Sequence, residues 1–175
     1  MPMHSSLLGI IAIIVLSVTF QAWDRSWSQV LGETAEMDRL RAKAEEAIGN
    51  DDPDGAALSM GRAALLAQQL SKSHRDDAAA ATIYLAAEPL FRSQEHGYRA
   101  MALFRRAGGQ LPASSGVCGS LALAQASVQQ ALSLLVPVSD KDVPPSLKER
   151  RKRFREAADD WVIVVASMIT DYQCP

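Results

Sequence analysis

Residues 147–173, LKERRKRFREAADDWVIVVASMITDYQ, decide the fold predicted for this chain. Their apolar side chains recur in steps of three and four, which places them on one face of a helix. These positions are Leu147, Phe154, Ala158, Trp161, Val165, Met168 and Tyr172. A repeat sustained along the whole segment predicts a straight helix that packs against other helices, either within a bundle or in a dimer.

The chain from residue 34 onward also predicts helices, which end at strong stop signals such as Gly49-Asn50 and Gly108-Gly109. Aromatic residues make up only 6% of the sequence and alanine is abundant, which favours close helix packing over β-sheet. We therefore expect an all-α soluble domain over residues 28–175, a bundle or short solenoid of about six antiparallel helices. The other predicted helices occupy residues 35–48, 54–71, 74–93, 95–107 and 117–136.

The first 27 residues differ from the rest of the chain. Residues 7–20, LLGIIAIIVLSVTF, carry no charge. Extended to residues 5–23, the segment would make a helix of about 28 Å, close to the ~30 Å hydrocarbon core of a bilayer. Trp23 and Trp27 follow where aromatic rings settle at the headgroups. We expect a transmembrane or signal-anchor segment over residues 1–27, with anchor positions Leu7, Ile10, Ile11, Ile14, Val15, Phe20 and Trp23.

A cleaved secretory signal peptide and a buried core helix are the alternatives for this segment. No Lys or Arg precedes residue 7, and no A-x-A-like site follows, which favours an uncleaved anchor. A short apolar segment ahead of a soluble domain usually exports that domain, so we expect it on the periplasmic or extracellular side. Arg25, Arg39, Arg41 and Lys43 favour the opposite orientation.

Composition narrows the function classes further. The chain has 175 residues, 48% of them hydrophobic, and a formal net charge of −2, which suits one globular domain and gives no reason to expect nucleic acid. Cys118 and Cys174 are the only cysteines. They could form a disulfide in an oxidising compartment, and they lack the C-x-x-C spacing of a metal site.

The densest charge cluster is KERRKRFR at residues 148–155, with six basic residues in eight. One interpretation is a solvated helix face with salt bridges to nearby acidic residues. The other is an interaction patch for acidic lipid headgroups or an acidic partner surface. Its candidate residues are Arg150, Arg151, Arg153 and Arg155.

No motif in the sequence specifies a reaction. The three histidines, His4, His74 and His96, form no closely spaced pair of the kind that binds metal. No haem-attachment site, nucleophile elbow, phosphate-binding glycine loop or H-E-x-x-H motif occurs. We expect no catalytic residue, cofactor or metal, and a small helical enzyme that uses His74 or His96 is the enzymatic alternative.

Residues 81–114 resemble one tetratricopeptide repeat, a family in which two antiparallel helices pair within 34 residues. Tyr84 and Phe91 match the aromatic positions of the first helix, and Ala100, Phe104, Ala107 and Pro112 match the second helix and its terminator. The resemblance implies stacked helical hairpins with a concave face for a peptide or partner protein.

These observations together predict a non-enzymatic, membrane-anchored helical protein that mediates protein–protein interaction as a scaffold or assembly factor. An accessory subunit of a larger membrane complex is the main alternative, and a secreted helical protein after signal cleavage is another. The expected partners are the membrane and other protein subunits, with no nucleic acid. A homo- or hetero-oligomer could form through the helix at residues 147–173.

Overall fold

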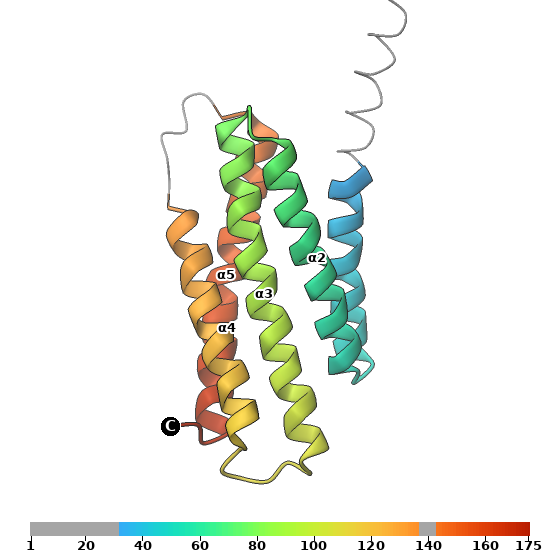
Figure 1. The fold of residues 1–175 in the computed structure, drawn as a ribbon, viewed down its shortest axis with the longest axis vertical. Coiled ribbons are helices and arrows are strands. Elements are labelled where there is room, and N and C mark those ends of the chain that lie inside the picture. Colours follow the sequence, from blue (N-terminus) through green and yellow to red (C-terminus); the bar gives the residue numbers. More distant parts are fainter. Residues whose placement is uncertain (1–31, 137–142) are drawn as a thin grey trace, which may run out of the picture. The chain divides into compact units, whose positions relative to one another are not determined.

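The computed structural model describes residues 32–136 and 143–175, and every regular element in that part of the chain is a helix. Residues 32–49 are helical, followed by α2 (Pro53–Ser73), α3 (Ala78–Arg106), α4 (Ser115–Leu134) and α5 (Pro145–Asp171) (Figure 1). Contacts divide the chain into Met1–Ala35 and Glu36–Pro175, and the second unit contains the bundle. The predicted all-α class is confirmed, with five helices in the described residues in place of about six.

Short polar turns start and end the helices. The Asp52 carboxylate accepts a hydrogen bond from the Gly55 backbone N–H at 2.9 Å, and Asp77 does the same for Ala80 at 3.0 Å. Such caps satisfy N–H groups that have no partner at the start of a helix. After α3, Gly108 and Gly109 take φ values of 72° and 68°, a left-handed conformation that glycine adopts without steric cost. These two glycines end α3 and let the chain reverse.

Helix α3 packs against α2, α4 and α5 and is the centre of the bundle (Figure 1). The buried Ser93 hydroxyl donates a hydrogen bond to the Ala124 carbonyl of α4 at 2.6 Å. A Cβ atom at Gly97 would lie 2.6 Å from Cζ2 of Trp161, so α3 and α5 touch where only glycine fits. Much of the remaining core consists of alanines, which let helices approach closely: Ala56, Ala63, Ala64, Ala67, Ala80, Ala86, Ala87, Ala100, Ala124, Ala131 and Ala158.

The apolar stripe that decided the predicted fold forms part of this core. Phe154, Ala158, Trp161, Val165 and Met168 are buried, while Leu147 and Tyr172 are half-buried. The Phe154 ring meets the Phe91 ring of α3 edge-on, with centroids 5.7 Å apart. The intramolecular interpretation of the stripe is therefore confirmed. The opposite face of α5, where Ile163 is 70% exposed, is the face left for contact with a second chain.

The helices predicted at 74–93 and 95–107 are wrong as separate elements, because α3 runs unbroken through both. Pro89 lies inside α3, where the missing hydrogen bond and the ring clash cost about 3 kcal/mol. Burial of the adjacent Leu90 and Phe91 offsets that cost. The hairpin implied for residues 81–114 would need a turn near residue 94, whereas the chain turns only after Arg106.

The predicted anchor lies outside the described residues. This applies to Leu7, Ile10, Ile11, Ile14, Val15, Phe20 and Trp23, and to the predicted segment over residues 1–27 as a whole. Among the helices that the structure does describe, none is both long enough and apolar enough to cross a bilayer.

Candidate interaction site

The α2–α3 hairpin carries a surface groove of about 390 Å³. Leu58 and Leu65 border it and are 59% and 51% exposed. These two leucines lie seven residues apart, or two helical turns, so they share one face of α2. The residues that line the α2–α3 groove are Asp54, Ala57, Leu58, Gly61, Arg62, Leu65, Arg92, Glu95 and Arg99.

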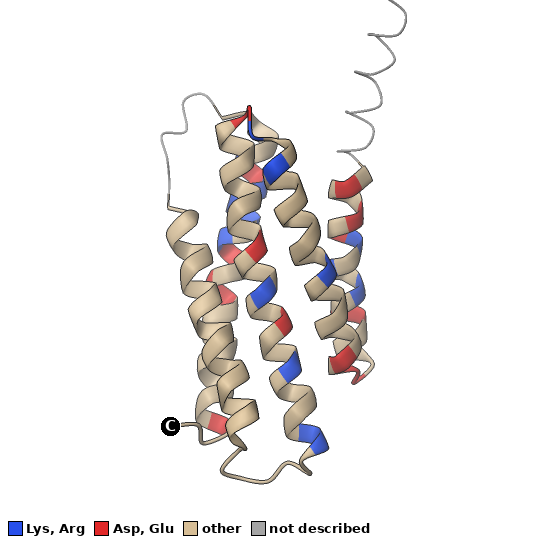
Figure 2. Ribbon diagram, in the orientation of Figure 1, with Lys and Arg blue, Asp and Glu red and all other residues tan. Residues whose placement is uncertain are grey.

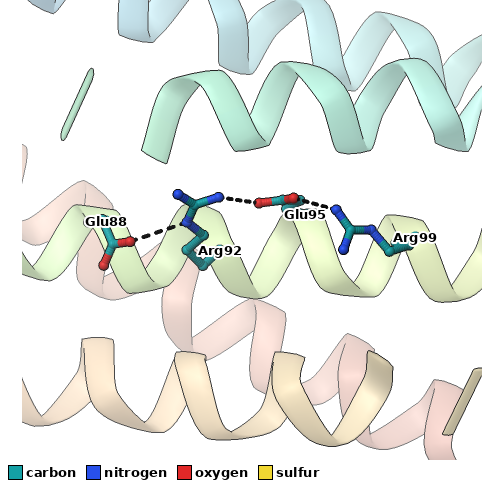
Figure 3. Close-up of polar contacts among 4 residues, drawn as sticks. All are labelled: Glu88, Arg92, Glu95 and Arg99. Carbon is teal, nitrogen blue, oxygen red and sulfur yellow. Dashed lines mark hydrogen bonds and ion pairs between the residues drawn. The ribbon is translucent and has the colours of Figure 1, made fainter. Parts of the chain in front are cut away.

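A chain of ion pairs runs along α3 beside this groove, on the side that faces α2 (Figure 3). Arg92 donates from Nε to Glu88 at 3.2 Å and from Nη1 to Glu95 at 2.8 Å. Arg99 donates from Nη2 to the other Glu95 oxygen at 2.6 Å. The Glu95 side chain is 11% exposed, so its charge is neutralised by two arginines in a partly dry setting.

The two arginines keep donors to spare. A guanidinium has five N–H donors, and these bonds use two from Arg92 and one from Arg99. The hydrogen bond to Glu95 raises the pKa of the Arg92 guanidinium, against the opposing effect of burial. Arg62 adds a further cation on the α2 side. The groove therefore combines apolar surface with arginines that suit an incoming carboxylate.

Gly61 sets how closely α2 approaches this ion-pair chain. A Cβ atom at this position would lie 3.1 Å from Cδ of Glu95 and 3.2 Å from its nearer carboxylate oxygen. Those contacts are tighter than side chains normally make, and Glu95 is held in place by Arg92 and Arg99. An alanine here would therefore push the Glu95 carboxylate by a few tenths of an ångström against its two arginine partners.

In the structure, the four arginines of the predicted basic patch lie in different surroundings. Arg150 is only 16% exposed, lies 3.6 Å from the Asp38 carboxylate and stacks over the Tyr84 ring at 5.9 Å from its centroid. It therefore belongs to the packing between helices. Arg151 is half-buried, Arg153 is exposed, and Arg155 pairs with Asp159 at 3.1 Å. The surface part of the patch consists of Arg151, Arg153 and Arg155.

Cys118 and Cys174 form a disulfide in the structure, with Cα atoms 5.4 Å apart across 56 residues of sequence. Two further contacts hold the same region together. The Phe104 and Tyr172 rings stack with centroids 4.1 Å apart, and the Ala113 N–H donates to the Tyr172 carbonyl at 2.9 Å. The end of α5 is thereby fastened to the α3–α4 connection.

The histidines within the described residues lie apart. His74 lies at the end of α2, where Nδ1 is 2.9 Å from the Leu70 carbonyl and the ring contacts Tyr84. His96 lies on α3, where burial lowers the pKa of its imidazole. Across residues 32–136 and 143–175, no group of three or more His, Cys, Asp or Glu side chains could hold a metal ion.

Sequence reasoning missed the α2–α3 groove. The signal was present in part, because Glu88, Arg92, Glu95 and Arg99 follow helical spacing with alternating sign. The predicted helix break near residue 94 placed Glu88 and Arg92 on one helix and Glu95 and Arg99 on another, so the four residues were not recognised as one chain of ion pairs. The approach of Gly61 to Glu95 depends on the register between two helices, which no local pattern reports.

Comparison with known proteins gave no relationship for this chain: a scan against protein-family models, a search of curated proteins and a search of solved structures each found no match.

Proposed function

We propose that this chain is a non-enzymatic, membrane-held helical protein that binds another protein through the α2–α3 groove, in the role of a scaffold or assembly factor. The occupant would be a segment of the partner that carries apolar side chains next to Asp or Glu. In this proposal the helical bundle lies on the exported side of the membrane.

The groove is the observation that carries the proposal. Leu58 and Leu65 keep more than half of their surface in water, where each would favour burial by a partner. Arg62 and Arg99 stand beside them, and arginine is among the residues most enriched where binding energy concentrates. The cations outnumber the acidic groups that line the groove, which favours an acidic partner segment over a basic one.

Two further observations support the location. The Cys118–Cys174 disulfide would persist in an oxidising compartment and would be reduced in most cytosols. Residues 7–20 have the composition of a membrane segment without a recognisable cleavage site. Both agree with a domain that is exported and remains attached.

An accessory subunit of a larger membrane complex is the second candidate. It is favoured by apolar side chains exposed away from the groove, at Leu123 on α4 and at Ile163 and Val164 on α5. A subunit embedded in a complex would cover several such faces at once. Co-purification at a fixed stoichiometric ratio under gentle detergent would support this candidate, and a substoichiometric, exchangeable partner would support the scaffold.

Site-specific photo-crosslinking in cells tests the groove. We expect a photoreactive residue at Leu65 to crosslink one defined protein, and the same residue at Leu123, which is 54% exposed on α4, not to crosslink it. Arg62→Glu should lower the Leu65 yield by about tenfold or more, because a hydrogen bond to a charged group contributes roughly 1.5–3 kcal/mol. Equal yields from Leu65 and Leu123, or no effect of Arg62→Glu, would refute the assignment.

A further inference from the structure

The strongest unexplained feature outside the groove is the charge distribution along α5. Residues 145–155 contain six basic residues and one glutamate, whereas residues 156–171 contain four acidic residues and no Lys or Arg (Figure 2). The helix macrodipole is positive at the N-terminal end, so helix stability favours the reverse arrangement. The first turn of α5 contains no acidic residue. Helix formation therefore does not account for this cluster.

The basic half of α5, residues 145–155, lies at the end of the bundle where the helix at residues 32–49 begins. Asp38, near the start of the compact unit at Glu36, is 3.6 Å from Arg150. Arg150 also lies over the Tyr84 ring near the start of α3, and Tyr84 contacts His74 in the α2–α3 turn. We call this the tether end, defined by Asp38, His74, Tyr84 and Arg150.

Two of the cations in the basic half of α5 are paired only at the exposed surface. Lys152 is 67% exposed and lies 3.9 Å from Glu156, and Arg155 is 43% exposed in its pair with Asp159. Exposed pairs of this kind contribute little and exchange partners readily. At the other end of α3, Arg105 and Arg106 each make two hydrogen bonds, Arg105 to the carbonyl and carboxylate of Asp51 and Arg106 to both carboxylate oxygens of Asp54. The two ends of the bundle therefore differ in their available positive charge.

The length of chain between the apolar segment and the bundle limits how far the tether end can move from a bilayer. Fifteen residues separate Phe20 from Glu36. Even fully extended they reach only about 50 Å. Such a tether would keep the tether end at a high effective concentration near the lipid headgroups.

We propose that the tether end carries a docking surface for anionic phospholipid headgroups, formed by the first three turns of α5 together with Lys72 in the last turn of α2 and Arg75 in the α2–α3 turn. The proposal rests on the membrane attachment in the proposed function and deepens it. Phosphate headgroups would replace the weak surface pairs of Lys152 and Arg155 and would meet Lys148 and Arg153 directly. Docking would orient the bundle on the bilayer, leaving the α2–α3 groove to its side.

The test is a lysine footprint of the full chain in vesicles. The protein is reconstituted into phosphatidylcholine alone or with phosphatidylglycerol, and each lysine's acetylation rate is measured by mass spectrometry. We expect Lys148 and Lys152 to react at least about threefold more slowly in the anionic vesicles, with Lys43 unchanged as the internal control. High salt should abolish the difference, since the Debye length falls to about 3 Å at 1 M.

A matched pair of variants separates local from global charge. Arg153 and Arg62 are both exposed, and each substitution by Glu changes the net charge equally. Arg153→Glu should weaken the protection of Lys148 and Lys152 from acetylation, because each positive charge removed lowers the local affinity for anionic lipid by up to about fivefold. Arg62→Glu should leave that protection unchanged. Equal lysine reactivity in both vesicle types would overturn the docking proposal, as would protection seen only in native membranes that contain other proteins.

Flotation of the same samples distinguishes failure of the two proposals. A chain that leaves both vesicle types in high salt would contradict the membrane attachment in the proposed function. A chain that floats with both but shows no lipid-dependent footprint would overturn only the docking surface.

Discussion

The contact between α3 and α5 predicts a measurable penalty for the smallest possible change at Gly97. A Cβ atom there would lie 2.6 Å from Cζ2 of Trp161 and 3.4 Å from Cε of Met168. Carbon atoms pack best at about 3.5–4.0 Å, so the indole must move by roughly 1 Å. Trp161 is buried against the core and also packs edge-on to Tyr98 at 5.1 Å, so it has little freedom to do so.

Gly97→Ala therefore combines two opposing effects. Alanine favours the helix over glycine by about 1 kcal/mol, whereas overpacking a core costs about 1–3 kcal/mol. The control is Gly119→Ala in α4, where a Cβ atom meets nothing within 4 Å and only the gain applies. We expect Gly97→Ala to be less stable than Gly119→Ala by about 1–3 kcal/mol, or roughly 3–12 °C in Tm.

Urea denaturation followed by far-UV circular dichroism measures both free energies of unfolding. Trp161 fluorescence, measured in a background in which Trp23 and Trp27 are replaced by Phe, reports the local displacement. If Gly97→Ala is stabilised as much as Gly119→Ala, with unchanged fluorescence, the close approach of α3 and α5 is refuted.

Three further predictions concern the ion-pair chain, the disulfide and the half-buried imidazole of His96. Glu95→Ala should lower the free energy of unfolding by about 2 kcal/mol in urea titration, and Glu156→Ala, in an exposed pair, by less than about 0.5 kcal/mol; equal losses would contradict the structure. Reducing the Cys118–Cys174 bridge, which closes a loop across 56 residues, should lower stability by about 4 kcal/mol, read from the guanidinium midpoint with and without reductant. Burial lowers the pKa of the His96 imidazole below 6.5, so on acidification the unfolded chain binds a proton at this residue before the folded chain does. The contribution of the neutral His96 imidazole to folding stability is therefore present above pH 6.5 and is lost as the pH falls below that value. A His96→Gln variant should flatten that part of the stability–pH profile, and an unchanged slope would exclude His96 as its source.

Prediction of the fold from sequence was most accurate where the residue pattern within a single helix was sufficient. The stripe of α5 has a regular period and a continuous apolar face, so burial of Phe154 and Trp161 followed from spacing alone. The helix predicted over residues 54–71 corresponds to α2, which begins at Pro53, a residue that the first turn of a helix accepts. These features depend on neighbours within a few residues.

The misplaced break in α3 has a different origin. Local preference places a helix end near Pro89, but tertiary packing of Leu90, Phe91 and Ser93 holds the helix together. The α2–α3 groove also depends on tertiary packing, so the sequence did not predict it. Its shape depends on which residue of α2 faces Glu95, and that register is set by close packing of alanines and Gly61 across two helices.

The basic patch was predicted correctly as a helical cluster of charge, but the burial of its individual arginines was not predicted. A helical period alone places Arg150, Arg151 and Arg153 around the whole circumference of α5. Only the structure separates Arg150, which packs on Tyr84, from Arg153, which is exposed. Long basic side chains can bury their stems while the charge finds a partner, so residue type does not decide the outcome.

We propose that this disulfide-closed helical domain is exported and stays attached to a membrane. Intact-mass measurement of the protein isolated from its native membrane, with and without reductant, tests it most directly. The account predicts a mass that includes residues 1–27 and that rises by two hydrogens on reduction. A mass that lacks the N-terminal apolar segment, or free thiols at Cys118 and Cys174 before reduction, would contradict it.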